Sequence, residues 1–417
     1  MEADGFILLD IGGTYIKSCN VEVGSEELRD IKTSYIPAFS SHLGPEREIS
    51  WSSFSRVISS AVGDQKKKSP KSRSILISGQ MGGFQSYLGE LVTWQDSRIS
   101  SSLSNVEYKI FLEKFRNCEG FARTGVKIYP GLPLLVCYFL QSKTGLLGAP
   151  LCFNSMISST VSVLTKESDG KIHSTDAAAS GFYDVINSEW LSEFTSLVEK
   201  SFYFPEVTNQ VEFVGYSQEF ELRVYCGVGD QQASLLGAGL NYENTIVNIG
   251  TGGQVAKKSR VEDLNEQNSF RPYFGSELIE TITHLPSGRA LRRFVEYCTG
   301  GDGSENFDQF FELIENNQTV GKLDIVNYDS TLSLIQKESF SKDYSGIAGS
   351  FFESITAAYV DAIQSVSKSG EIIFAGGVGQ KFNALSEKVA RDLKRKVSIA
   401  KSTETTLDGL AKISQSI

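Results

Sequence analysis

The sequence predicts an α/β fold made of two related domains that face a cleft. An apolar run leads into Asp10–Thr14, with the sequence Asp-Ile-Gly-Gly-Thr, and a second apolar run leads into Ile249–Gly253, with the sequence Ile-Gly-Thr-Gly-Gly. The same strand and glycine turn therefore occur once in each half of the chain. A chain of 417 residues is also too long for one compact core. We expect a domain at residues 1–222 and another at 223–417.

Local patterns predict the elements of the first half. Phe6–Val23 is a strand, a tight turn and a second strand, and Ser74–Ser78 is a buried strand that enters the glycine loop Gly79–Gly83. Amphipathic or apolar patterning then predicts three helices and, after them, a loop with a strand; these segments are Leu103–Cys118, Pro130–Leu140, Glu189–Ser201 and Pro205–Val214.

In the second half, Asp230 is predicted to begin a helix of small residues, because apolar and small side chains follow it at helical spacing. Thr245–Gly253 is predicted as a buried strand that enters a turn. Phe351–Ile363 is a predicted helix, and Glu371–Gly379 is a buried strand that ends in a glycine-rich turn. Thr299–Tyr344 is rich in Ser, Asn and Asp and shows few strand signals, so helices and loops are expected there.

Composition excludes several classes of partner. The net charge of −10 and the pI near 5.1 argue against a nucleic-acid-binding surface, and the one dense basic cluster, Lys66–Arg73, is interpreted as a solvated loop. The six cysteines and three histidines show no metal-ligand spacing. No signal peptide precedes the first strand, and no apolar run is long enough to span a membrane. We therefore expect no membrane partner and a cytoplasmic protein, or an organellar one whose transit peptide has been removed.

Asp230 is the first candidate catalytic residue. It lies on a glycine-flanked turn, in the sequence Gly229-Asp-Gln-Gln232, shortly before the turn Gly250–Gly253, whose backbone N–H groups are suited to holding phosphate. A proton acceptor beside a phosphate loop indicates phosphoryl transfer to an alcohol. The competing interpretation is a helix N-cap, and both roles are compatible because the helix terminus favours the carboxylate form.

Three further motifs suit the same chemistry, and each has a purely structural alternative. Asp10–Thr14 offers backbone donors, a hydroxyl and a carboxylate for phosphate and Mg²⁺. A simple hairpin turn with two glycines has the same sequence pattern. Gly376–Gly379 lets backbone approach a phosphate or a flat ring, or it is a simple turn. Trp94–Arg98 combines an aromatic plate with polar groups that suit a sugar, or it is a core anchor with an Asp–Arg pair. Lys17 could reach a phosphate or lie on the surface of its strand.

Taken in order, these motifs resemble the FGGY carbohydrate kinases, which are relatives of actin, hexokinase and the heat-shock chaperones. The resemblance covers nearly the whole chain. The matching segments are Asp10–Thr14 as first phosphate motif, Gly79–Gly83 as sugar loop, Trp94–Arg98, a loose match at Thr175–Gly181, Gly229–Gln232 as base motif, Gly250–Gly253 as second phosphate motif and Gly376–Gly379 as adenosine motif.

The resemblance implies two ribonuclease-H-like α/β domains, ATP and Mg²⁺ as cofactors, a small sugar as substrate, and a chain that is compatible with a homodimer. It implies that Asp230 is the general base and Asp10 the residue that organises Mg²⁺. The substrate-binding residues it implies are Gln80, Met81, Gly82, Trp94, Asp96, Asp230 and Gln231. The residues it implies for the nucleotide are Gly12, Gly13, Thr14, Lys17, Gly250, Thr251, Gly252, Gly288, Gly376, Gly377, Gly379 and Lys381.

Within the family, Leu91–Arg98 and Arg271–Ser276 are most similar to sedoheptulokinases, which predicts a ketose substrate such as sedoheptulose. Two positions depart from the family. Gly82 stands where many ketose kinases have a sugar-contacting histidine, which predicts one donor fewer and more room for a longer sugar. Lys381 stands near the place of an asparagine in some relatives.

Other functions compete with this interpretation. A kinase for xylulose, ribulose or glycerol would carry nearly the same motifs. An actin-like ATPase that acts as a nucleotide switch would need no sugar loop, so Trp94–Arg98 argues against it. A weakly active kinase retained for regulation is disfavoured by intact Asp10, Asp230 and Thr251 but is compatible with Gly82.

Overall fold

The computed structural model describes residues 5–41, 44–86, 88–144, 150–167, 170–250, 252–265, 267–299, 323–328, 331–336 and 344–417. The chain forms two compact units. The first contains Met1–Gly237, Phe270–Leu278 and Thr406–Ile417, and the second contains Ala238–Ser269 and Ile279–Thr405. The predicted boundary at 222/223 therefore differs from the observed one at 237/238. Sequence order could not predict that two later segments rejoin the first unit.

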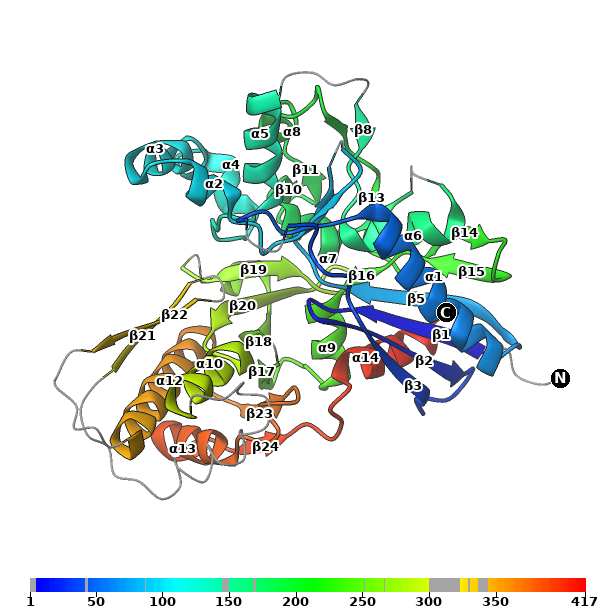
Figure 1. Cartoon of the computed structure of the whole chain (residues 1–417). Coiled ribbons are helices and arrows are strands. Elements are labelled where there is room, and N and C mark those ends of the chain that lie inside the picture. The colour runs from blue at the N-terminus through cyan, green and yellow to red at the C-terminus, as the bar shows by residue number, and fades with distance from the viewer. Residues whose placement is uncertain are drawn as a thin grey trace. The chain divides into compact units, whose positions relative to one another are not determined.

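A seven-stranded sheet forms the centre of the first unit (Figure 1). Its order is β14-β15-β5-β1-β2-β3, and β16 also pairs with β5. The strands are β1 (Gly5–Ile11), β2 (Tyr15–Glu22), β3 (Arg29–Tyr35), β5 (Ser72–Gly79), β14 (Phe213–Ser217), β15 (Leu222–Tyr225) and β16 (Val228–Gly229). The hairpin of β1 and β2 confirms the predicted strand, turn and strand, and β5 runs parallel to β1.

The sheet is covered on both faces, because β1 alternates its apolar side chains between two cores. Ile7, Leu9 and Ile11 pack in one core with α1 (Trp51–Lys68) and α6 (Met156–Thr165). Phe6 and Leu8 point to the other face and pack in a second core with α14 (Thr405–Ser414). The packing of α14 on this face brings the C-terminal segment into the first unit.

A third core of the first unit is rich in aromatic side chains, among them Phe84, Phe115 and Phe153. The predicted helix at Leu103–Cys118 is confirmed as α3 (Asn105–Arg116), and the one at Pro130–Leu140 as α5 (Pro133–Thr144). The prediction of one helix at Glu189–Ser201 is wrong, because strand β11 (Glu189–Trp190) is followed only by the short helix α8 (Ser192–Thr195). Trp190 packs edge-on against Phe153, which ties this segment into the aromatic core.

Short elements complete the first unit. They are β4 (Glu48–Ile49), β6 (Phe84–Gln85), β7 (Leu91–Val92), β8 (Leu151–Cys152), β9 (Ile172–His173), β10 (Tyr183–Asp184), β12 (Phe202–Tyr203), β13 (Val207–Thr208), α2 (Arg98–Ser102), α4 (Glu119–Arg123), α7 (Ser174–Ala177) and α9 (Asp230–Gly237). Strand β19 (Ser269–Pro272) leads into the segment that returns to this unit.

The second unit has strands in the order β20-β18-β17-β23-β24. They are β17 (Asn244–Ile249), β18 (Gly253–Ser259), β20 (Leu278–Leu285), β23 (Glu371–Ala375) and β24 (Val397–Ile399), with helices α10 (Gly288–Thr299), α12 (Tyr344–Val366) and α13 (Asn383–Leu393). These elements confirm the strands predicted before Gly250 and Gly376 and the helix predicted at Phe351–Ile363. One core joins sheet and helices, and within it Phe294 of α10 stacks on Phe351 of α12 with ring centroids 4.0 Å apart.

The prediction of helices and loops for Thr299–Tyr344 is wrong where the structure describes this stretch. Strands β21 (Leu323–Tyr328) and β22 (Thr331–Gln336) pair antiparallel there, and the rest of the stretch up to residue 343 lies outside the described residues. Their alternation of polar and apolar residues is a strand signal that the polar composition of the longer segment hides. Among the described residues, no helix is both long and apolar enough to cross a membrane.

Candidate functional site

In the first unit, three strands bring the predicted motifs to one edge of the sheet. Strands β1 and β16 both run parallel to β5, and the last residues of β1 and β16, Ile11 and Gly229, are both in register with Gly79. The carboxyl ends of these strands therefore lie side by side, which is where open α/β sheets bind ligands. The turn after Asp10, the loop that begins at Gln80 and the helix that begins at Asp230 all follow from that edge.

The carboxylate of Asp230 lies at the first residue of α9, and its Oδ1 accepts the backbone N–H of Gln231 at 2.8 Å. Asp230 is therefore the first residue of the helix rather than the N-cap before it, and its carboxylate binds the N–H of the second helical residue. Burial raises the pKa of Asp230 from 3.8 to about 6, while the N–H of Gln231 and the charge of Arg271 lower it. The sequence predicted that the helix terminus favours the carboxylate. Burial opposes that effect, yet the group is still ionised at neutral pH.

Asp176 is a second buried carboxyl group beside this site. Ser155 Oγ donates to its Oδ2, while its Oδ1 has no hydrogen-bond partner. Burial raises the pKa of Asp176 from 3.8 to about 7, and its charge in turn raises the pKa of Asp230. Its neighbour Thr175 accepts the backbone N–H of Gly229 through Oγ1 at 3.0 Å, so α7 fixes the turn that carries Asp230.

The loop Gly79–Gly83, Trp94 and the first glycine turn lie together. Trp94 Nε1 donates to Gln80 Oε1 at 3.1 Å, and Gln80 Nε2 donates to the carbonyl of Gly12 at 3.4 Å. Gln80 is buried, so the bond orients the indole against the loop. Met81, the next residue, packs against Gly229 in the space that a Cβ there would occupy.

The prediction that Gly82 leaves extra room is wrong. Gly82 has φ +75°, and a Cβ at this position would lie 2.5 Å from Tyr129 Oη and 3.3 Å from Trp94 Cβ. The phenol of Tyr129 therefore occupies the space where a side chain at residue 82 would lie. The phenol also places a hydroxyl at this position.

Asp96, predicted to bind substrate, is held by its own loop. Arg98 donates from Nε to Oδ1 at 2.9 Å and from Nη2 to Oδ2 at 2.7 Å, and the Arg47 backbone N–H also donates to Oδ2. The side chain of Asp96 has 0% exposed surface. In this arrangement the bidentate pair fixes the loop that carries Trp94.

Arg271 begins the string Arg271–Ser276, but it was not among the predicted site residues. It lies on β19, its Nη1 donates to Gln231 Oε1 at 3.0 Å, and it interacts electrostatically with Asp230 and Tyr129. Tyr129, on the turn before Pro130, was also missed, because an aromatic residue in a turn carries no motif. We call Gln80, Gly82, Trp94, Tyr129, Asp230, Gln231 and Arg271 the Asp230 cluster.

The first phosphate turn offers a carboxylate and open backbone. Asp10 Oδ1 accepts Ser78 Oγ–H at 3.0 Å, and Lys17 lies directly opposite Asp10 in the hairpin. Thr14 and Gly13 are partly exposed at the tip. Among the described residues, no group of three or more His, Cys, Asp or Glu side chains could hold a metal ion. A hard cation at Asp10 would therefore take its remaining ligands from water or a bound phosphate.

In the second unit, three glycine segments converge where β17 and β23 end. The strands are parallel, and the carbonyl of Ile249 accepts the N–H groups of Val378 and Gly379, each at 3.0 Å. Gly288, at the start of α10, donates to the carbonyl of Gly250 at 3.1 Å. The structure thus brings together the predicted nucleotide residues Gly250, Gly288 and Gly376–Gly379. Thr251 lies outside the described residues.

This convergence depends on glycine. Gly376 has φ +81°, and a Cβ there would lie 2.5 Å from Asn248 Oδ1 and 2.6 Å from the Ile249 carbonyl oxygen. By contrast, a Cβ on Gly250, Gly252 or Gly377 would meet nothing within 4 Å. Open space therefore lies beside the backbone of these three residues, as a phosphate or nucleotide cradle requires, while the N–H of Gly250 itself donates to the carbonyl of Gly252 at 3.0 Å. Lys381 follows the turn and is exposed.

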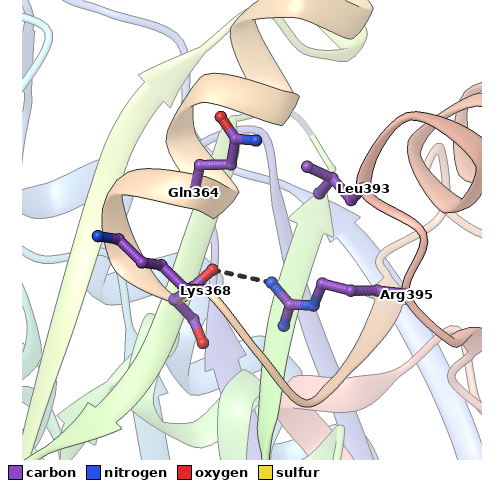
Figure 2. Close-up of a pocket in the computed structure, with 5 residues that line it drawn as sticks. Gln364, Lys368, Leu393 and Arg395 are labelled. Atoms are coloured by element: carbon purple, nitrogen blue, oxygen red, sulfur yellow. Dashed lines mark hydrogen bonds between the residues drawn. The ribbon is translucent and has the colours of Figure 1, made fainter.

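A cavity of about 240 Å³ also lies in the second unit, and Figure 2 shows Gln364, Lys368, Leu393 and Arg395 around it. Arg395 donates to the carbonyls of Ser367 and Gly370, each at 2.8 Å, which closes the C-terminal end of α12. None of the predicted site residues lines this cavity. Because Arg395 binds backbone carbonyls, we interpret it as structural.

Comparison with known proteins identifies the fold. No family model matches the sequence, and no curated protein does. Solved structures do match. The gluconate kinase of Lactobacillus acidophilus has a TM-score of 0.82 at 15% identity, over 99% of this chain and 89% of that chain.

Two further matches have nearly the same coverage. The ligand-bound xylulose kinase of the same organism has a TM-score of 0.79 at 14% identity, over 99% of this chain and 89% of that one. The Plasmodium falciparum glycerol kinase with ADP has a TM-score of 0.77 at 13% identity, with the same coverage. The chain has the fold of these carbohydrate kinases. This confirms the predicted fold class of two ribonuclease-H-like α/β domains.

Proposed function

We propose that this protein is an ATP-dependent sugar kinase that transfers the γ-phosphate to a primary hydroxyl of a polyhydroxylated acceptor. The observation that carries the proposal is the setting of Asp230. Its carboxylate follows the carboxyl end of β16, has a pKa of about 6, and lies in one cluster with a tryptophan, a phenol and two amide side chains. An aromatic plate with polar groups is the usual environment for a sugar.

In the proposed reaction, the acceptor oxygen attacks the γ-phosphorus, a new O–P bond forms, and the bond to the β-phosphate oxygen breaks to release ADP. Asp230 accepts the proton of the attacking hydroxyl, which a carboxylate that is ionised at neutral pH can do. Trp94 and Gln80 orient the sugar face, and Tyr129 donates to a sugar oxygen. Thr175 holds the turn that carries Asp230, and the backbone N–H of Gln231 holds its carboxylate.

Mg·ATP fits the residues present. The open glycines of the second unit can cradle the nucleotide, and the partly exposed Asp10 can hold Mg²⁺ through water. When bound, Mg²⁺ shields the negative charge of the phosphates. Gly12, Gly13, Thr14 and Thr251 are proposed as further phosphate contacts, with Lys17 and Lys381 near the phosphates. Asp96 is proposed to act on the sugar through the loop that it fixes.

The choice of acceptor follows from other observations. The strings Leu91–Arg98 and Arg271–Ser276 favour a ketose such as sedoheptulose, with xylulose, ribulose and glycerol as alternatives. Because Tyr129 fills the space at Gly82, the argument from a larger pocket no longer supports a long chain. The similarity of the fold to the structures described as xylulose, gluconate and glycerol kinases supports the reaction class rather than one acceptor.

The test is Asp230→Asn. We expect the variant to fold and to bind Mg·ATP as the wild type does, and to lose at least about 100-fold in turnover, the usual effect of a lost general base. ADP release with a panel of C3 to C7 acceptors measures turnover, and calorimetry measures nucleotide binding. Near wild-type turnover in Asp230→Asn, or no acceptor-dependent ADP release from the wild type, would contradict the proposal.

A further inference from the structure

The guanidinium of Arg271 lacks a partner for part of its charge. Its Nη1 donates to Gln231 Oε1 at 3.0 Å, but its Nε is buried and has no hydrogen-bond partner. Within the described part of the chain it forms no ion pair, and Asp230 acts on it only through space. By contrast, the buried Arg98 is paired with the carboxylates of Asp96 and Glu48.

Arg271 is half-buried, but its Nε is inaccessible to water, so this side of the guanidinium has lost its hydration without gaining a hydrogen bond, which is costly. Burial lowers the pKa of Arg271, while Tyr129 and Asp230 raise it. The bond to Gln231 uses Nη1, so the edge of the guanidinium that carries Nε is left without a hydrogen-bond partner. This edge is one that binds a planar carboxylate through two parallel N–H groups.

The position of Arg271 indicates which molecule supplies a hydrogen-bond partner for Nε. Arg271 interacts with Tyr129, whose hydroxyl lies against Gly82, and with Asp230, the proposed base. A sugar bound between Trp94 and Asp230 would therefore lie next to the guanidinium. A neutral sugar could offer hydroxyl oxygens to Nε but no charge.

We infer that the acceptor carries a carboxylate and that Arg271 binds it, so that the preferred substrate is a sugar acid of the aldonate class. The inference rests on the proposed kinase function. It favours a different acceptor from the neutral ketose that the segments Leu91–Arg98 and Arg271–Ser276 predict. Arg271 would then be a residue that determines specificity.

The phosphoryl group that is being transferred is a second candidate partner for Arg271, because it is also an anion near Asp230. The two sources predict different behaviour. A partner of the acceptor carboxylate discriminates between acid and neutral acceptors. A partner of the phosphoryl group affects all acceptors alike, because every acceptor receives the same group.

The experiment compares kcat/KM for matched pairs that differ only in the carboxylate, D-gluconate with D-glucitol and D-xylonate with xylitol, and includes sedoheptulose and xylulose. We expect the wild type to prefer the acid of each pair by about 100-fold or more, as for a buried charge pair. Arg271→Met should abolish this preference, chiefly by lowering kcat/KM for the acids. Arg271→Lys should retain part of it, because lysine keeps the charge but not the fork.

Arg223→Met is the matched control. Arg223 is exposed on β15 of the same unit, where its guanidinium lies over the Phe213 ring, so its loss should leave the preference unchanged. Equal or better use of the neutral partner by the wild type would overturn the inference, even if Arg271→Met failed to fold. An equal loss on acids and neutral acceptors would assign Arg271 to the phosphoryl group instead. Failure of the kinase proposal itself is distinguishable, since no acceptor would then stimulate ADP release.

Discussion

Asp176 supplies a stability prediction that does not depend on the proposed function. It is buried, one carboxylate oxygen has no partner, and burial raises its pKa from 3.8 to about 7. Because the folded pKa is higher than the unfolded one, the folded state binds the proton more tightly. The stability that this proton provides is fully present below pH 3.8 and is lost as pH rises through 7.

The magnitude follows from the size of this rise. A change from 3.8 to about 7 corresponds to about 4 kcal/mol at 1.36 kcal/mol per pH unit. About 3 kcal/mol of it falls between pH 5 and pH 8. Asn has nearly the same shape and no charge, so Asp176→Asn should remove this pH dependence. Relative to the wild type, the variant should gain about 3 kcal/mol in free energy of unfolding across this window.

The assay is urea unfolding of wild type and variant at several pH values between about 5 and 8, followed by tryptophan fluorescence. The chain has 3 tryptophans, Trp51, Trp94 and Trp190, and all belong to the first unit, which contains Asp176. The signal therefore reports the unit that the substitution affects, even if the two units unfold separately.

Asp64→Asn is the matched control. Asp64 lies on α1 of the same unit, and its hydrogen bond from Lys32 lowers its pKa, so it stays ionised in both states across this window. Its substitution should shift stability by the same amount at every pH. If the difference between Asp176→Asn and wild type were equally constant, the argument that burial raises the pKa of Asp176 would be refuted.

Three further predictions concern the site. Because Asp230 must be ionised and has a pKa of about 6, kcat/KM should fall about tenfold per pH unit below 6, and a pH–rate profile without an acidic limb would contradict this. Gly376→Ala should destabilise the second unit by about 1–3 kcal/mol, because φ is +81° and the added Cβ meets Asn248 and Ile249. Thermal melts of both variants measure this effect. Gly377→Ala should destabilise the unit much less, since its added Cβ would meet no atom within 4 Å. Trp94→Ala should raise KM for every acceptor in the C3 to C7 panel. A rise for one acceptor alone would argue against stacking of the sugar on the Trp94 ring.

The sequence by itself determined the parts that depend on neighbouring residues. The turn of Asp10–Thr14, the strand before Gly250 and the glycine turn at Gly376 were predictable, because alternating apolar residues and glycines specify strands and tight turns locally. The place of Asp230 at the start of a helix was predictable for the same reason. Their order along the chain was sufficient to predict the fold class.

Tertiary structure alone decided which distant groups meet. Arg271 lies next to Gln231, and Tyr129 occupies the space beside Gly82, because the loops carrying them pack in one unit, and no local pattern encodes such a contact. The assignment of Thr406–Ile417 to the first unit arises in the same way, from the packing of α14 on the sheet. The pKa values of Asp176 and Asp230 also belong to the folded state. Burial removes water from a carboxylate, and only the packed chain determines how much water is removed.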